Sequence, residues 1–133
     1  MSIERATYMD SSAIVKLAVR EPESAALRRY LRRKRPLVTS ALARTEVARA
    51  LLPLGHDAVA RGEEVLRTLD VVRINDQILK SAGSMLPLDL RSLDAIHLAT
   101  AIALGEDLAR ICTYDSRMGT SAAALGLAVV APN

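Results

Sequence analysis

Residues 6–16 read ATYMDSSAIVK, and they decide the fold because they join a buried strand to a helix through a carboxylate. The apolar run before the carboxylate predicts a short buried strand. After the two serines, apolar residues return at helical spacing, which predicts a helix from Ser11 or Ser12 to about residue 19. Asp10 lies between the two elements. It is either a turn or helix-cap residue, or part of a site that it shares with other carboxylates.

The remainder of the chain alternates between the same two kinds of segment. Strands alternating with helices indicate βαβ units and therefore a parallel sheet. Continuous apolar strands suit a sheet that helices cover on both faces. We therefore expect one three-layer α/β/α domain that spans residues 1–133. Its further predicted strands are 36–40, 69–74, 109–114 and 127–132, and its further helices are about 22–34, 41–54, 57–69, 76–85, 92–104 and 116–126.

Composition narrows the class of protein. Half of the 133 residues are apolar, which excludes disorder, and the absence of Phe and Trp disfavours recognition of nucleic acid by base stacking. A net charge of +3 permits an anionic partner such as nucleic acid. Cys112 is the single cysteine and is expected to be buried. The sequence has neither a secretion signal nor an apolar run of about 18 residues, so we expect a cytoplasmic protein without a membrane segment.

Four acidic residues stand at unusual positions. Asp10 and Asp115 follow predicted strands, and the carboxyl ends of parallel strands open onto a common crevice. Glu46 borders the apolar stripe of its helix, and Asp94 begins a nearly uncharged helix. Taken singly, they could be helix caps, a complement to a helix dipole, or an ion-pair partner of a nearby arginine. Taken together they would repel one another unless a cation neutralised them, and oxygen ligands without a Cys–His cluster favour Mg²⁺ or Mn²⁺.

Four blocks of sequence carry a resemblance to a known family. YMDSSAIVKL, SALARTEVARAL, LRSLDAIHLATA and TYDSRM resemble, in this order and spacing, the signature blocks of the PIN-domain ribonucleases, and above all of the VapC toxins. The resemblance covers about residues 8–130. It implies a parallel sheet of order 3-2-1-4-5, in which the first and fourth strands are neighbours. It also implies a metal-dependent endoribonuclease that uses Mg²⁺, with Mn²⁺ as an alternative ion.

The resemblance also assigns site residues by position. Thr113 matches a hydroxyl that the family has at the end of this strand, and Ser11 follows the first acid. Either hydroxyl could orient a carboxylate or a metal-bound water. Some relatives carry a further acid where this chain has Arg117, so one ion is expected and a second would be held less firmly. The acids assigned to catalysis and metal binding are Asp10, Glu46, Asp94 and Asp115, with Glu46 as either an outer ligand or a residue that orients the water.

Basic residues are expected to contact phosphate groups. Arg91 and Arg117 lie beside the predicted acids, and we expect them to contact RNA or a partner protein. The densest basic run, 28–35, is interpreted as a solvated helix end. His97 follows Asp94 by three residues and could be a ligand or a general acid. The simpler interpretation is a histidine that forms hydrogen bonds within a packed helix.

The resemblance finally implies a biological role and leaves alternatives. It implies a toxin that inhibits translation, a homodimer, and a tight complex with an antitoxin whose tail enters the acidic site. An RNA-processing nuclease that is not a toxin stays open, as does a non-catalytic module that binds RNA or protein, although four intact acids disfavour the module. A receiver-like phosphoacceptor domain also gathers acids around Mg²⁺. The chain lacks the Asp after the third strand and the Lys after the fifth that such domains have.

Overall fold

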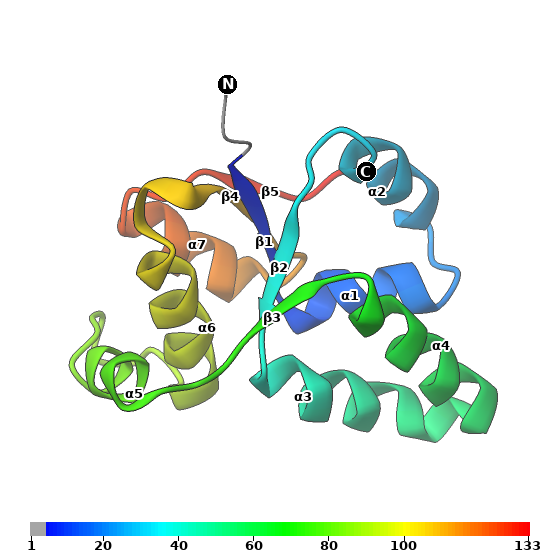
Figure 1. Cartoon of the computed structure of the whole chain (residues 1–133), viewed down its shortest axis with the longest axis horizontal. Coiled ribbons are helices and arrows are strands. Elements are labelled where there is room, and N and C mark those ends of the chain that lie inside the picture. The colour runs from blue at the N-terminus through cyan, green and yellow to red at the C-terminus, as the bar shows by residue number, and fades with distance from the viewer. Residues whose placement is uncertain (1–4) are drawn as a thin grey trace.

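The computed structural model describes residues 5–133, and its centre is a sheet of five parallel strands (Figure 1). The strand order is β3-β2-β1-β4-β5, which confirms the predicted fold class and strand order. β1 lies in the middle of the sheet, where Tyr8 is opposite Val38 of β2 on one side and Ile111 of β4 on the other. The strands are β1 (Ala6–Met9), β2 (Leu37–Ser40), β3 (Asp70–Val72), β4 (Leu108–Cys112) and β5 (Val129–Val130).

Helices cover both faces of this sheet. In Figure 1, α1 to α4 lie on one side of the strands and α6 and α7 on the other, with α5 packed against α6. The α-helices are α1 (Ser11–Ala18), α2 (Ser24–Leu31), α3 (Leu42–Leu51), α4 (His56–Arg67), α5 (Asp76–Gly83), α6 (Ser92–Ala103) and α7 (Ser116–Ala124). Short 3-10 helices, η1 (Leu52–Leu54) and η2 (Gly105–Asp107), follow α3 and α6.

The central strand explains why both faces must be covered. Successive side chains of a strand point to opposite faces, and all four residues of β1 are buried. Met9 belongs to the hydrophobic cluster that α1 to α4 cover, together with Ile14 and Leu27. Tyr8 belongs to the cluster on the other face, where it packs with Leu98 of α6. Half-covered strands would expose one of these two clusters, so the three layers follow from the apolar character of β1.

The start of α1 differs from the prediction. Asp10, rather than Ser11 or Ser12, is the N-cap, and its side chain accepts a hydrogen bond of 3.1 Å from the backbone N–H of Ala13. Asp10 has extended backbone dihedral angles, as an N-cap residue must. The helix-cap interpretation of Asp10 is therefore correct. Because Asp10 caps the helix, the hydroxyls of Ser11 and Ser12 are available for other contacts.

The second helix is shorter than predicted. Pro22 lies in a turn that precedes α2, instead of in its first helical turn. The turn is closed by Ser24, whose hydroxyl accepts from the backbone N–H of Glu21 at 2.9 Å and donates to the carbonyl of Val19 at 3.0 Å. This compact turn satisfies backbone groups that the helix would otherwise satisfy, so the helix starts only afterwards.

Three further expectations concern the chain as a whole. Across residues 5–133, no helix combines the length and the apolarity that a membrane crossing requires. The first four residues, on which the expectation of no secretion signal partly rests, lie outside the described residues. Cys112 is buried as predicted, and burial together with the charge of Asp10 raises the pKa of its thiol to about 12.

Candidate active site

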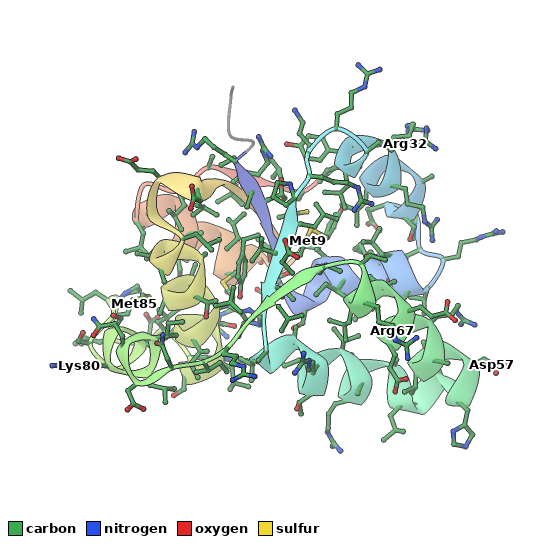
Figure 2. The ribbon with its side chains drawn as sticks, viewed as in Figure 1. Met9, Arg32, Asp57, Arg67, Lys80 and Met85 are labelled. Atoms are coloured by element: carbon green, nitrogen blue, oxygen red, sulfur yellow. The ribbon has the colours of Figure 1, made fainter. Side chains whose placement is uncertain are left out.

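The four predicted acids lie on elements that meet at the edge of the sheet where the strands end. Asp10 directly follows β1, and Asp115 caps α7 just beyond β4, the neighbour of β1. Glu46 lies on α3, which begins just after β2, and Asp94 lies in the first turn of α6. Figure 2 labels Met9, the last residue of β1, near the centre of the molecule. Parallel topology thus brings acids from distant parts of the sequence to one edge.

Asp10 is a buried carboxylate held by three donors. Its side chain is only 3% exposed. Oδ1 accepts from the Ser12 hydroxyl at 2.6 Å and from the Ala13 N–H at 3.1 Å, and Oδ2 accepts from the Thr113 hydroxyl. Burial raises the pKa of Asp10 above its ordinary value, and the hydrogen bonds oppose that rise only in part. The carboxylate is therefore well oriented, but its negative charge is poorly stabilised.

For Glu46, in contrast to Asp10, hydrogen bonding to the carboxylate outweighs the effect of burial on the pKa. Its Oε1 accepts from the His97 ring nitrogen Nε2 at 2.5 Å and from the Ser11 hydroxyl at 2.6 Å. Burial of the carboxylate favours the neutral acid, but these two hydrogen bonds and the nearby His97 outweigh it and hold the pKa of Glu46 below its ordinary value. Ion pairs with the neighbouring arginines Arg44 and Arg49 are absent from the described residues. The contacts of Glu46 face the sheet edge instead.

Asp94 and Asp115 lie closer to solvent. Burial raises the pKa of Asp94 first, and the charges of Asp115 and Glu46 raise it further, against the opposing effects of His97 and Arg91. Asp115 is exposed, and its Oδ1 caps α7 by accepting from the N–H groups of Arg117 and Met118. The helix-cap interpretation of Asp115 is thus also correct. The charges of Asp94, Asp115 and Glu46 therefore lie in one region.

These acids fit a hard divalent cation by their chemistry, although they are not assembled into a finished ligand set. Within residues 5–133, no group of three or more His, Cys, Asp or Glu side chains is arranged to hold a metal ion. The ion pairs found in the same range leave Asp10, Asp94 and Asp115 without a positive partner. Carboxylates that gather in one region and form no ion pair suit Mg²⁺ or Mn²⁺. A bound ion would have to draw the side chains closer together.

Arg91 and Arg117 line one pocket with Asp94. This pocket has a volume of about 290 Å³ and also presents the hydroxyls of Ser116 and Thr120. Both arginines are exposed, so their charges are available to a phosphate group. A larger cavity of about 630 Å³ lies between α3, α4 and β3 and contains none of the four acids. The pocket beside Asp94 therefore adjoins the site, as does a second pocket of about 460 Å³ that Thr113 and Asp115 line.

The basic run 28–35 lies far from these residues along the sheet. It spans the end of α2 and the turn that leads into the amino end of β2, whereas the acids follow carboxyl ends. In Figure 2, Arg32 projects outward from this end of the molecule. Its arginines Arg28, Arg29, Arg32, Arg33 and Arg35 are exposed, which agrees with the interpretation of a solvated helix end.

Sequence reasoning missed Ser12 and the partners of His97. Ser12 holds Asp10, whereas Ser11 donates to the carboxylate of Glu46, and the Ser12 hydroxyl also accepts from the N–H of Tyr114 at 2.9 Å. His97 forms hydrogen bonds as expected, but its partners are Glu46 and the hydroxyl of Tyr8 rather than its own helix. The sequence shows Tyr8 close to Asp10, and His97 one helical turn after Asp94. Neither position indicates that His97 contacts Tyr8 and Glu46.

Comparison with known proteins identifies the family. The family model of the PIN domain matches residues 7–122. Ribonuclease VapC46 of Mycobacterium tuberculosis is 61% identical over 128 residues, which cover 96% of this chain and 98% of that protein. These two findings concern nearly the whole sequence.

Solved structures agree on the fold. The crystal structure of Mycobacterium tuberculosis VapC20, a sarcin-ricin loop cleaving toxin, has a TM-score of 0.76 at 18% identity and covers 95% of this chain and 99% of that one. A chain of a toxin–antitoxin complex from Klebsiella pneumoniae has a TM-score of 0.73 at 21% identity, with 96% and 98% covered. At such identities the likeness shows the fold alone. The matched family and the high identity to VapC46 together show that the chain belongs to the PIN-domain family, among its VapC ribonucleases.

Proposed function

We propose that this protein is a Mg²⁺-dependent endoribonuclease that hydrolyses RNA phosphodiester bonds at the edge formed by Asp10, Glu46, Asp94 and Asp115. The observation that carries the proposal is the electrostatic one: Asp10 is buried with a raised pKa and no positive partner in the described residues, and Asp94 is repelled by two other acids. A folded protein retains such repulsion at a cost in stability unless a ligand relieves it. PIN-domain nucleases generally use divalent metal ions, which would provide that relief.

The residues divide into three roles. Asp10, Asp94 and Asp115 hold the ion, and Ser12 and Thr113 keep Asp10 in one orientation through their hydroxyls. When bound, a divalent cation lowers the pKa of water and polarises the phosphoryl oxygen. Glu46 is ionised because its pKa is low, so it can accept a hydrogen bond from the attacking water.

The two arginines are assigned to substrate contact. Arg91 and Arg117 face the pocket next to Asp94 and bind a phosphate of the RNA there. Arg117 also stands where some relatives carry a further acid. A second ion is therefore held less firmly than the first, and we propose a single ion as the working state.

We further propose that the protein is the toxin of a VapBC-type pair. The named relatives are VapC ribonucleases, and one fold neighbour was solved in a toxin–antitoxin complex. On this proposal the chain forms a homodimer, acts on RNA in the cytoplasm to inhibit translation, and is silenced by an antitoxin whose basic tail enters the acidic edge. Positive side chains of such a tail would neutralise the same carboxylates that otherwise hold the ion.

Cleavage of a total-RNA pool by the purified protein tests the nuclease. We expect cleavage with Mg²⁺ or Mn²⁺, none in chelator, and a loss of at least about a hundredfold in rate for Asp10→Asn, as for loss of a central catalytic electrostatic group. Asp57→Asn is the matched control. The substitution is chemically the same, but Asp57 is exposed at the start of α4, and Figure 2 shows it at the outer end of that helix.

Calorimetric titration with the same ions separates the outcomes. Cleavage that survives Asp10→Asn would refute the assigned site. A protein that neither cuts RNA nor binds either ion would refute the metal-dependent nuclease itself. Ion binding that is lost with Asp10→Asn and kept with Asp57→Asn would support the site even before the substrate is known.

A further inference from the structure

A buried polar chain connects the core of the sheet to Glu46. Tyr8 of β1 is fully buried, and its hydroxyl is 2.6 Å from the ring nitrogen Nδ1 of His97 on α6. The other ring nitrogen, Nε2, contacts Oε1 of Glu46 at 2.5 Å. The rings of Tyr8 and His97 meet edge to face, with centroids 5.8 Å apart. His97 is itself only 2% exposed, so both ring nitrogens have protein partners and neither faces water.

The ring of His97 is held through both of its nitrogens. The carboxylate of Glu46 accepts at Oε1, so Nε2 is the donor in that contact. The Tyr8 hydroxyl, which can donate or accept, pairs with Nδ1 on the other side of the ring. Tyr8 therefore fixes the ring orientation in which Nε2 can hold Glu46.

These hydrogen bonds occupy one carboxylate oxygen of Glu46 and leave the other without a partner among the described residues. Oε1 already accepts from both His97 and Ser11, whereas no hydrogen bond to Oε2 is found within residues 5–133. Two donors on one oxygen restrict the rotation of the carboxylate. The orientation of the free oxygen is thus set by residues that lie behind Glu46, in the core.

A purely structural role explains the hydrogen-bonded series Tyr8–His97–Glu46 poorly. The hydrophobic side chains packed around Tyr8 are aliphatic ones and methionines, whereas its hydroxyl lies near Thr100 and Ser40 as well as His97. Apolar residues of similar volume in place of a buried polar pair are often neutral or stabilising. A linked series of polar groups that leads from β1 to a candidate catalytic acid is better explained by what it does to that acid.

We propose that Tyr8 and His97 are positioning residues that hold Glu46 by Oε1 and leave Oε2 as its single working oxygen. The inference rests on the proposed function, since it deepens the role of the same site. It narrows the role of Glu46: with one free oxygen, this acid orients a water or contacts the ion through that oxygen, and it does not chelate the ion with both.

Calorimetric titration of Mn²⁺, together with RNA-cleavage kinetics, tests the role. His97→Met fills a similar volume without a donor, and we expect about tenfold weaker Mn²⁺ binding or more, with a larger fall in kcat than rise in KM. His97→Gln keeps an amide that can donate to Glu46, and it should recover most of the loss. Tyr8→Phe removes only the hydroxyl and should fall between the wild type and His97→Met.

Controls distinguish positioning from stability. Tyr30→Phe makes the same chemical change on α2, remote from the acids, and should bind Mn²⁺ as the wild type does. Thermal unfolding of each variant in chelator measures the stability that it lost. If His97→Met does not fold, Tyr8→Phe and His97→Gln decide the question.

The two proposals fail in different ways. A wild type that binds no Mn²⁺ would overturn the metal site and with it the role of the chain. A wild type that binds Mn²⁺, with Tyr8→Phe and His97→Met variants that bind and cleave equally well, would overturn the positioning role alone. Weakened variants that His97→Gln fails to rescue would also overturn it, because the donated hydrogen bond would then not be the cause.

Discussion

Asp10 carries a conflict between folding and function that can be measured on a single residue. Its folded pKa is raised above the ordinary value of 3.8 because the carboxylate is buried. Between those two pKa values the folded state binds more protons than the unfolded state, so the free energy of unfolding falls as pH rises through this window. In chelator at neutral pH, we expect Asp10→Asn to be more stable than the wild type by about 1 kcal/mol, the scale of an incompletely satisfied buried group.

Urea unfolding of both proteins at a series of pH values checks this sign. The advantage of Asp10→Asn should shrink as pH falls towards 3.8, where the wild-type carboxylate becomes protonated in both states. Saturating Mg²⁺ should stabilise only the wild type, by about 2.7 kcal/mol at a hundred times Kd. If the wild type were more stable than Asp10→Asn at neutral pH in chelator, the prediction would be wrong.

At the scale of elements, the close packing of α3 on α4 holds the helix that carries Glu46. A Cβ at Gly62 of α4 would stand 2.6 Å from Leu51 Cδ1 and 3.0 Å from Val47 Cγ1. Both neighbours are at most 1% exposed, so overpacking should cost about 1–3 kcal/mol. Alanine gains about 1 kcal/mol over glycine inside a helix. We therefore expect Gly62→Ala to lower the free energy of unfolding, by up to about 2 kcal/mol in urea titrations.

Gly83 provides the matched glycine. It ends α5, and a Cβ there would meet nothing within 4 Å. Gly83→Ala should therefore be neutral or stabilising, by at most about 1 kcal/mol. If Gly62→Ala stabilised the protein as much as Gly83→Ala, the close approach of α3 and α4 would be wrong. Because Val47 directly follows Glu46, a destabilised contact should also reduce cleavage.

Element type was predictable from periodicity, but element length was not. The apolar run 127–132 predicted a strand, yet only Val129 and Val130 form β5. These two residues pair with Ile111 and Cys112 at the end of β4, and β5 is an edge strand with one neighbour. Apolar character predicts an extended conformation, whereas the partner strand determines how far the ladder runs.

At the scale of the whole molecule, the sequence located the acids but not their partners. A parallel sheet places strand ends on one edge, so Asp10 and Asp115 could be brought together by topology alone. The strand order itself came from the family resemblance. His97 contacts Tyr8, which is 89 positions away in the sequence, and Glu46, which is 51 positions away. No local pattern encodes such pairs, because they depend on how α6 packs across the end of the sheet.

Whole-molecule charge distribution yields the last prediction, on RNA binding. Arg91 and Arg117 lie beside the acids, and Arg32 and Arg33 lie at the opposite edge of the sheet. Arg91→Ala with Arg117→Ala should weaken binding of labelled single-stranded RNA in chelator about tenfold, as for two partly exposed ion pairs. The slope of log affinity against log salt should become shallower by about 1.4, or about 0.7 for each lost phosphate contact. Fluorescence anisotropy at several salt concentrations measures both.

Arg32→Ala with Arg33→Ala lowers the formal net charge from +3 by the same two units, so the two double variants are matched in net charge. Only direct contact distinguishes them. If the two variants lost affinity and salt slope to the same extent, RNA would be held by net charge, and the pocket beside Asp94 would not be where the phosphate binds. A loss confined to the Arg91 and Arg117 variant would instead place the RNA backbone next to the carboxylates, where a phosphodiester must lie to be cut.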